Sequence, residues 1–154
     1  MTDILSLKVE ELVSKIKDSQ LTSVEICKRY IERVNEFEKD VKAWAHLNKK
    51  LLLEKAAEAD EHRRSGKPTG PLHGIPVAVK DIIGTLDMPT ECGTVIRKGK
   101  SYSQNAEIVD LLLSAGAIVM GKTATSELAY LGPSKTTNPH DYTRTPGGSS
   151  SGSA

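Results

Sequence analysis

The chain has 154 residues, a length typical of one domain, and 21 Lys plus Arg against 20 Asp plus Glu leave a net charge of +1. That balance argues against a broad positive surface for nucleic acid or anionic lipid. Aromatic residues, at 4%, are too few to build stacking platforms for single-stranded bases. We therefore expect no direct contact with nucleic acid, and a folded core built from aliphatic side chains.

The sequence carries no signal for export or membrane insertion. The N-terminus lacks a basic region followed by an apolar run, and the longest apolar runs are far shorter than the roughly 20 residues that cross a bilayer. The two cysteines, Cys27 and Cys92, are too few for a disulfide framework and are expected to be reduced. The sequence therefore predicts a cytoplasmic protein with no membrane contact.

Residues 1–66 are predicted to form a helical layer. The apolar spacing from Val9 to Ile16 predicts a first helix, with Ser6 as its N-cap. The segment Thr22 to Glu25 has the pattern of a capping box, which opens a second helix. A third helix is predicted over 48–64, and its charged second half is expected to be a solvated face.

From residue 67 the pattern changes to that of an α/β core. The predicted elements are a strand over 75–81, a helix over 106–115 closed by Gly116, and an apolar strand over 117–121. In the helix, Ile108, Leu111 and Leu112 are expected to point inward. A strand, a crossover helix and a strand that is apolar on both faces indicate a parallel βαβ unit, so the predicted fold class is α/β.

Lys80 lies at the end of the first predicted strand. The two-residue period of a strand puts Lys80 on one face with Pro76 and Ala78, and puts Val77 and Val79 on the other. A lysine among small residues at a strand end can be buried. An isolated lysine is more often exposed, so position alone does not assign a function to it.

The segment Gly116 to Thr123 has the letters of a phosphate-binding loop, Gly, four residues, Gly, Lys, Thr. Its context differs from that of a true loop, because a helix precedes Gly116 and the four variable residues have a strand pattern. We interpret the match as coincidental and Lys122 as an ordinary strand-end residue.

The Gly- and Ser-rich segment from Thr145 to Ala154 has the composition of a flexible linker. It is preceded, however, by Gly132 to Pro146, whose Asn-Pro-His-Asp turn chemistry is not low-complexity and leads directly into the glycines. This lead-in favours an ordered segment.

Four motifs, taken together and in order, resemble the amidase signature family. They are Gly74 to Asp81, Gly121 to Thr123 with Glu127 to Ala129, Asn138 to Asp141, and Pro146 to Ala154. The likeness spans essentially the whole chain. It implies an α/β fold with a mixed central sheet covered by helices on both sides, of which residues 1–154 are a truncated N-terminal part: the helical layer 1–66 and the start of the catalytic core, 67–154.

The resemblance also implies amide hydrolysis through a triad of Ser, cis-Ser and Lys. By motif position Lys80 matches the lysine and Ser149 the cis serine, whose peptide bond with Gly148 is cis in the family. A lysine accepts a proton only when neutral, a form that burial or a nearby cation favours. The nucleophilic serine is expected beyond residue 154, so these residues alone are predicted to be inactive. The family needs no cofactor.

Some positions depart from the common pattern. Ser151 stands where glycine is usual, and Asp87 to Gly93 and Ala124 to Ser126 also differ from the A subunit of the tRNA-dependent amidotransferase. They favour a general amidase acting on a small-molecule amide. The alternative enzyme is the A subunit of glutamyl-tRNA(Gln) amidotransferase. A non-catalytic interaction module or gene relic is the non-enzyme alternative.

The four histidines show no paired ligand spacing, so no metal site is predicted. No pattern in the sequence identifies the substrate-binding residues, the oligomeric state or a partner subunit. Strands that lie inside a larger sheet lose neighbours in a shorter chain. We therefore expect exposed apolar side chains at Val77, Val79, Ile118 and Val119.

Overall fold

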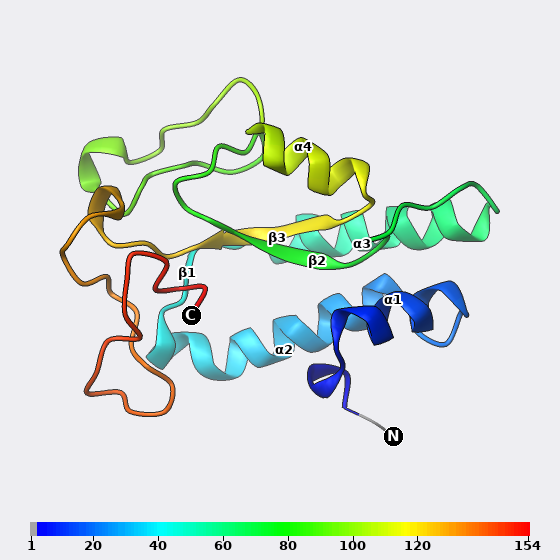
Figure 1. Ribbon diagram of the computed structural model, residues 1–154, viewed down its shortest axis with the longest axis horizontal. Helices are drawn as coiled ribbons and strands as arrows, with labels where there is room; N and C mark the ends of the chain where they lie inside the picture. Colours follow the sequence, from blue (N-terminus) through cyan, green and yellow to red (C-terminus); the bar gives the residue numbers. More distant parts are fainter. Residues whose placement is uncertain (1–2) are drawn as a thin grey trace. The chain divides into compact units, whose positions relative to one another are not determined.

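The computed structural model describes residues 3–154 and has the predicted α/β fold class (Figure 1). Its longer elements are helices α1 (Val9–Lys17), α2 (Ser23–Val41), α3 (Lys49–Arg64) and α4 (Glu107–Ser114), and strands β1 (Trp44–His46), β2 (Pro76–Lys80) and β3 (Ile118–Thr123). Short 3-10 turns cover Ile4–Ser6, Val95–Arg97 and Glu127–Ala129.

The three strands form one mixed sheet in the order β1-β3-β2. Strand β1, which has no counterpart among the predicted elements, runs antiparallel to β3, with Trp44 opposite Thr123 and His46 opposite Lys122. Beside β2, the N–H of Ile118 donates to Ile75 (2.8 Å) and the carbonyl of Thr123 accepts from Asp81 (3.0 Å). Both strands advance together between these two bonds, so β2 and β3 are parallel, as the predicted βαβ unit requires.

The chain divides into two compact units. The first comprises residues up to Val34, Asn48–Val77 and Asp110–Met120, and the second comprises Asn35–Leu47, Ala78–Val109 and Gly121–Ala154. The core of the first unit is aliphatic, as predicted, and consists of Leu12, Ile16, Ile26 and Ile75. The second unit contains both of the residues that the resemblance assigns to the reaction.

The helix starts follow local sequence signals, with one correction. At the start of α2, the Thr22 hydroxyl accepts from the N–H of Glu25 (3.1 Å), and the Glu25 carboxylate accepts from the N–H of Thr22 (2.8 Å). This confirms the capping box. Ser6 is not the N-cap of α1, since the helix begins later in the chain: Lys8 is the N-cap, and the Glu11 carboxylate accepts from its N–H (2.7 Å).

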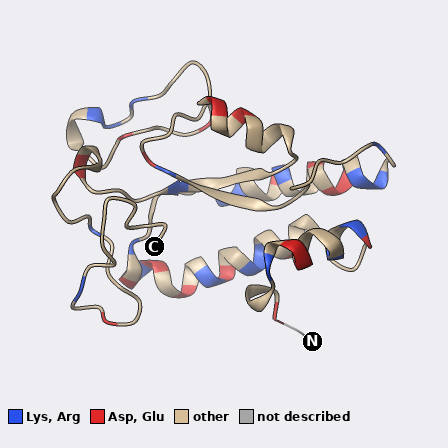
Figure 2. Cartoon of the chain, viewed as in Figure 1, with Lys and Arg blue, Asp and Glu red and all other residues tan. Residues whose placement is uncertain are grey.

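In the charged half of α3 most side chains are exposed, but Arg63 is half-buried and Asp60 is buried. This carboxylate is buried and accepts from the N–H groups of Ser23 (2.8 Å) and Val24 (3.1 Å), two free donors at the start of α2. The charges of α1 to α3 are of both signs and are interspersed along the helices (Figure 2). The prediction of a solvated face fails most clearly at Asp60, because a tertiary contact gives that carboxylate two partners.

Helix α4 buries a different face from the one predicted. Val109 is buried and Leu112 is half-buried, whereas Ile108 and Leu111 are 52% and 58% exposed. The segment is apolar at consecutive positions, so two helical stripes offset by one residue fit its sequence equally well. Gly116 ends the helix with φ of +87°, as predicted.

The expected exposure of the strands is also partly wrong. Val79 and Ile118 are buried, and Val77 and Val119 are half-buried. The β2–β3 pair is therefore covered by the described chain itself. Most of the exposed large apolar side chains belong instead to the 3-10 turn Val95–Arg97, to α4 and to the segment 128–131.

Candidate active site

Lys80 is the last residue of β2 and is half-buried. Its carbonyl accepts from the N–H groups of Ile82 (2.8 Å) and Ile83 (3.0 Å), so the chain turns immediately after the strand. Ala78, two residues earlier on the same face, is exposed. The strand therefore directs the Lys80 side chain towards a partly open region.

Ser149 lies in a segment that is tied to the residues following β3. The N–H of Ser126 donates to the carbonyl of Ser149 (3.1 Å), and the N–H of Gly152 donates to the carbonyl of Ala124 (2.9 Å). The peptide bond between Gly148 and Ser149 is cis, the geometry that the resemblance implies. The Gly/Ser-rich end of the chain is thus an ordered part of the second unit.

The two residues singled out by the resemblance are in direct contact. The Nζ of Lys80 donates a hydrogen bond of 2.6 Å to the Oγ of Ser149, across 69 residues of sequence. A separation this short allows a proton to move between the two atoms. Of the neighbouring hydroxyls, Ser150 is exposed, and the buried Oγ of Ser151 has no hydrogen-bond partner among the described residues.

A pocket of about 450 Å³ opens beside Ser149. It is lined by Thr145, by Gly147, Gly148 and Ser149, and by the segment 129–133. Lys80 does not line this pocket. A small molecule bound there would therefore contact Ser149 rather than Lys80.

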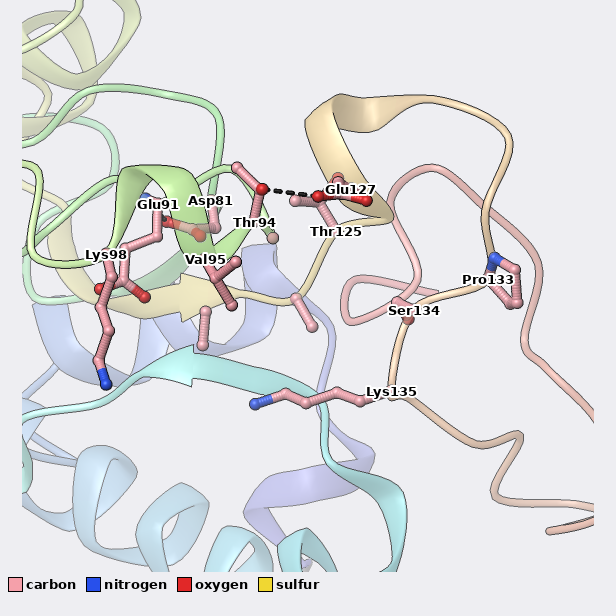
Figure 3. Close-up of a pocket in the computed structure, with 13 residues that line it drawn as sticks. Asp81, Glu91, Thr94, Val95, Lys98, Thr125, Glu127, Pro133, Ser134 and Lys135 are labelled. Atoms are coloured by element: carbon pink, nitrogen blue, oxygen red, sulfur yellow. Dashed lines mark hydrogen bonds between the residues drawn. The ribbon is translucent and has the colours of Figure 1, made fainter.

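Asp81 is among the residues that line a second pocket, of about 540 Å³ (Figure 3). Its walls carry carboxylates from Asp81, Glu91 and Glu127 and the ammonium groups of Lys98 and Lys135. Two of the carboxylates have polar neighbours in the protein: the hydroxyl of Thr94 donates to Glu127 (2.6 Å), and the imidazole of His46 lies 3.2 Å from Glu91. This pocket has charged walls of both signs and shares only Pro133 with the pocket at Ser149.

Lys122 is fully buried, contrary to its interpretation as an ordinary strand-end residue. Its ammonium donates to the hydroxyl of Thr90 (2.6 Å) and to the carbonyls of Ile83 (2.7 Å) and Pro89 (3.4 Å), and lies 3.7 Å from a carboxylate oxygen of Asp81. Burial lowers the pKa of Lys122 below its ordinary value, although the charge of Asp81 opposes this effect.

The burial of Lys122 could have been inferred from the sequence. Lys122 directly follows the predicted strand 117–121, which is apolar on both faces, as is typical of a strand covered on both sides, and β3 in fact continues through Lys122 to Thr123. The structure also supports rejecting a phosphate-binding loop, because residues 118–123 are the strand β3 itself.

Within residues 3–154, no group of three or more His, Cys, Asp or Glu side chains could hold a metal ion. In the same part of the chain, no helix is both long and apolar enough to span a bilayer. Both cysteines are free: Cys27 is buried and Cys92 is half-buried.

Comparison with known proteins gives concordant results. The model of the Amidase family matches residues 25–154. The glutamyl-tRNA(Gln) amidotransferase of Chloroflexus aurantiacus has an A subunit that is 39% identical over 160 residues, which cover all of this chain and 33% of that protein. The chain thus spans about a third of the length of the curated relatives it matches.

Solved structures share the fold. The peptide amidase from Stenotrophomonas maltophilia superposes with a TM-score of 0.89 at 34% identity, over 96% of this chain and 33% of that one. A fatty acid amide hydrolase superposes with a TM-score of 0.89 at 28% identity, over 97% of this chain and 27% of that one.

Proposed function

Because the chain belongs to the amidase family, we propose that it supplies part of the active site of an amide C–N hydrolase, with Lys80 as the base and Ser149 as the proton relay. The observation that carries this proposal is the 2.6 Å contact between Lys80 Nζ and Ser149 Oγ. Two polar side chains 69 residues apart meet where the family motifs place a lysine and a serine.

The proposed chemistry moves one proton along a path. A nucleophilic serine supplied by residues beyond 154 attacks the amide carbonyl and gives its proton to Ser149 Oγ, while Ser149 passes its own proton to neutral Lys80. The path then runs in reverse and protonates the leaving nitrogen, so the C–N bond breaks and an acyl-enzyme remains. Water hydrolyses this intermediate by the same route, and no cofactor takes part.

We propose a small-molecule amide as the substrate, since the pocket of about 450 Å³ beside Ser149 has the size of a small-ligand site. The second candidate is the A subunit of the glutamyl-tRNA(Gln) amidotransferase. The identity of 39% to the Chloroflexus aurantiacus protein favours it, whereas Ser151 and the segment 87–93 favour a general amidase. The free cysteines are compatible with the reducing cytoplasm expected from the sequence.

The test uses a completed amidase, in which residues 1–154 are joined to the C-terminal two thirds of the Stenotrophomonas maltophilia peptide amidase. Lys80→Ala removes the base, so the acylation rate on a chromogenic anilide should fall by more than about 10⁴-fold. Ser149→Ala should be severe but less complete, because a water molecule can replace its hydroxyl in the path.

The double variant separates a shared path from two independent effects. Both residues are proposed to act on one proton. The double variant, Lys80→Ala with Ser149→Ala, should therefore lower the acylation rate by a factor far smaller than the product of the two single-variant factors. The proposal fails if Lys80→Ala turns over the anilide at near the parent rate while circular dichroism shows a folded protein.

A further inference from the structure

Lys122 is connected to Lys80 by two consecutive hydrogen bonds. Lys122 Nζ donates to the carbonyl of Ile83 (2.7 Å), and the N–H of Ile83 donates to the carbonyl of Lys80 (3.0 Å). The N–H of Ile82 donates to the same Lys80 carbonyl (2.8 Å). The ammonium of Lys122 therefore helps to fix the backbone of Lys80, from which the Lys80 side chain extends.

Asp81 provides a second connection. Its carboxylate lies 3.7 Å from Lys122 Nζ and accepts from the N–H of Glu91 (3.2 Å). Its own N–H donates to the carbonyl of Thr123 (3.0 Å), and its carbonyl accepts from the N–H of Cys92 (2.9 Å). The residue that follows Lys80 is thus fixed through both its backbone and its side chain.

An apolar side chain could fill the site of Lys122 at lower cost. Burying an ammonium is unfavourable even when it is paired, and such pairs are often replaced by hydrophobic residues without loss of stability. An apolar residue, however, could not make directional hydrogen bonds. Lys122 donates to three oxygens of the segment 83–90, which follows Lys80 closely in the chain. These bonds define one conformation for that segment.

We propose that Lys122 is a positioning residue for Lys80. Its ammonium, with Asp81 as the countercharge, locks the segment 81–90 and holds the end of β2 so that Lys80 Nζ meets Ser149 Oγ in a single arrangement. This role rests on the proposed function of Lys80 as the base. It replaces the interpretation of Lys122 as an ordinary strand-end residue.

The kinetic test uses Lys122→Met in the completed amidase, at a temperature where circular dichroism shows the variant folded. A misplaced base slows chemistry without altering substrate contacts, so kcat should fall at least about 100-fold while KM changes less than about threefold. The matched control is Asp60→Asn, which disturbs a buried carboxylate remote in sequence from the site. It should lower the melting temperature and leave kcat unchanged.

A milder pair covers the case in which Lys122→Met does not fold. Thr90→Val removes the hydroxyl that accepts from Lys122 at 2.6 Å, and Thr90→Ser keeps it. We expect kcat to fall about tenfold in Thr90→Val and to stay within about twofold of the parent in Thr90→Ser. Equal kcat values in Thr90→Val, Thr90→Ser and the parent would overturn the positioning role.

A structural readout needs no turnover. In crystals of the 154-residue Thr90→Val chain, the 2.6 Å contact between Lys80 and Ser149 should be lost or split between conformers, and Thr90→Ser should retain it. An unchanged contact in Thr90→Val refutes the positioning role. The role of Lys80 as the base is tested separately. Full turnover of the completed amidase after Lys80→Ala refutes that role, even if the Thr90→Val chain loses the contact between Lys80 and Ser149.

Discussion

At the scale of single residues, Cys27 shows how burial acts on a thiol. It lies fully buried in α2, and burial, reinforced by the negative charge of Asp60, raises the pKa of Cys27 to about 12. In an unfolded chain the thiol titrates with a pKa near 9.0. Between these two values the folded protein keeps a proton that the unfolded chain has released, so stability falls as the pH rises.

This linkage predicts a measurable difference in alkaline solution. By about pH 10.5 the thiol of Cys27 should have cost the native state about 2 kcal/mol, at about 1.4 kcal/mol per pKa unit. Urea unfolding at about pH 8 and about pH 10.5 measures this loss, with Cys27→Ala as the control that removes the group. If the parent and Cys27→Ala lose equal stability over that range, the thiol is not the cause.

The pairing of Lys80 with Ser149 could be anticipated, because motif order assigns both residues to one reaction. The partners of Lys122 and Asp60 could not, since each depends on segments distant in sequence. Lys122 binds Ile83 across 39 residues, and Asp60 binds Ser23 across 37. A pattern within a short window describes neither contact, so both side chains looked like ordinary charged residues.

At the scale of elements, most signals carried by a few adjacent residues mark real helix ends, as the capping box at Thr22 and the turn at Gly116 do. The predicted N-cap at Ser6 is the exception, because α1 begins after Lys8. Strand β1 was missed because three residues are too few to show a period. The prediction of which face of α4 is buried was wrong. The segment is apolar on several sides, so tertiary packing decides which side faces the core.

Gly121 illustrates how one element constrains another. A Cβ at this position would lie 2.6 Å from the carbonyl oxygen of His46 and 2.9 Å from the Trp44 ring. The close approach of β1 to β3 therefore requires glycine in mid-strand. This requirement, rather than phosphate binding, explains the glycine that the loop-like motif contains.

We predict that Gly121→Ala lowers the free energy of unfolding by about 1–3 kcal/mol, because the added methyl group meets backbone that cannot move independently. Gly132→Ala is the matched control, since a Cβ there meets no atom within 4 Å. Thermal unfolding of both variants makes the comparison. A Gly121→Ala chain as stable as Gly132→Ala would contradict the close packing of the two strands.

At the scale of the whole molecule, the α/β class followed from periodicity, whereas the distribution of exposed apolar surface did not. Val95 and Ile96 are 86% and 87% exposed, although no sequence pattern singled them out. Exposure depends on which segments cover which, and that information is not local. Apolar residues in such a turn are typical of contact surfaces.

The proposed mechanism leads to a prediction for the 154-residue chain. We expect no amidase activity, because the nucleophilic serine and the groups that stabilise the tetrahedral intermediate are proposed to lie beyond residue 154. A fluorophosphonate probe should leave every serine of the chain unlabelled, while it labels the completed amidase. Covalent labelling of the folded 154-residue chain would contradict the expectation.

Ser149 follows Lys80 by 69 positions in the sequence, and this separation determines which of the two is available first during translation. At about 5–20 residues per second, the ribosome adds the serine about 3–14 s after the lysine. Lys122 is synthesised before Ser149, as are all the residues that its ammonium contacts, Asp81, Ile83, Pro89 and Thr90. A nascent chain can therefore build the framework around Lys80 before Ser149 is added, so that the contact between Lys80 and Ser149 forms on a surface that already exists.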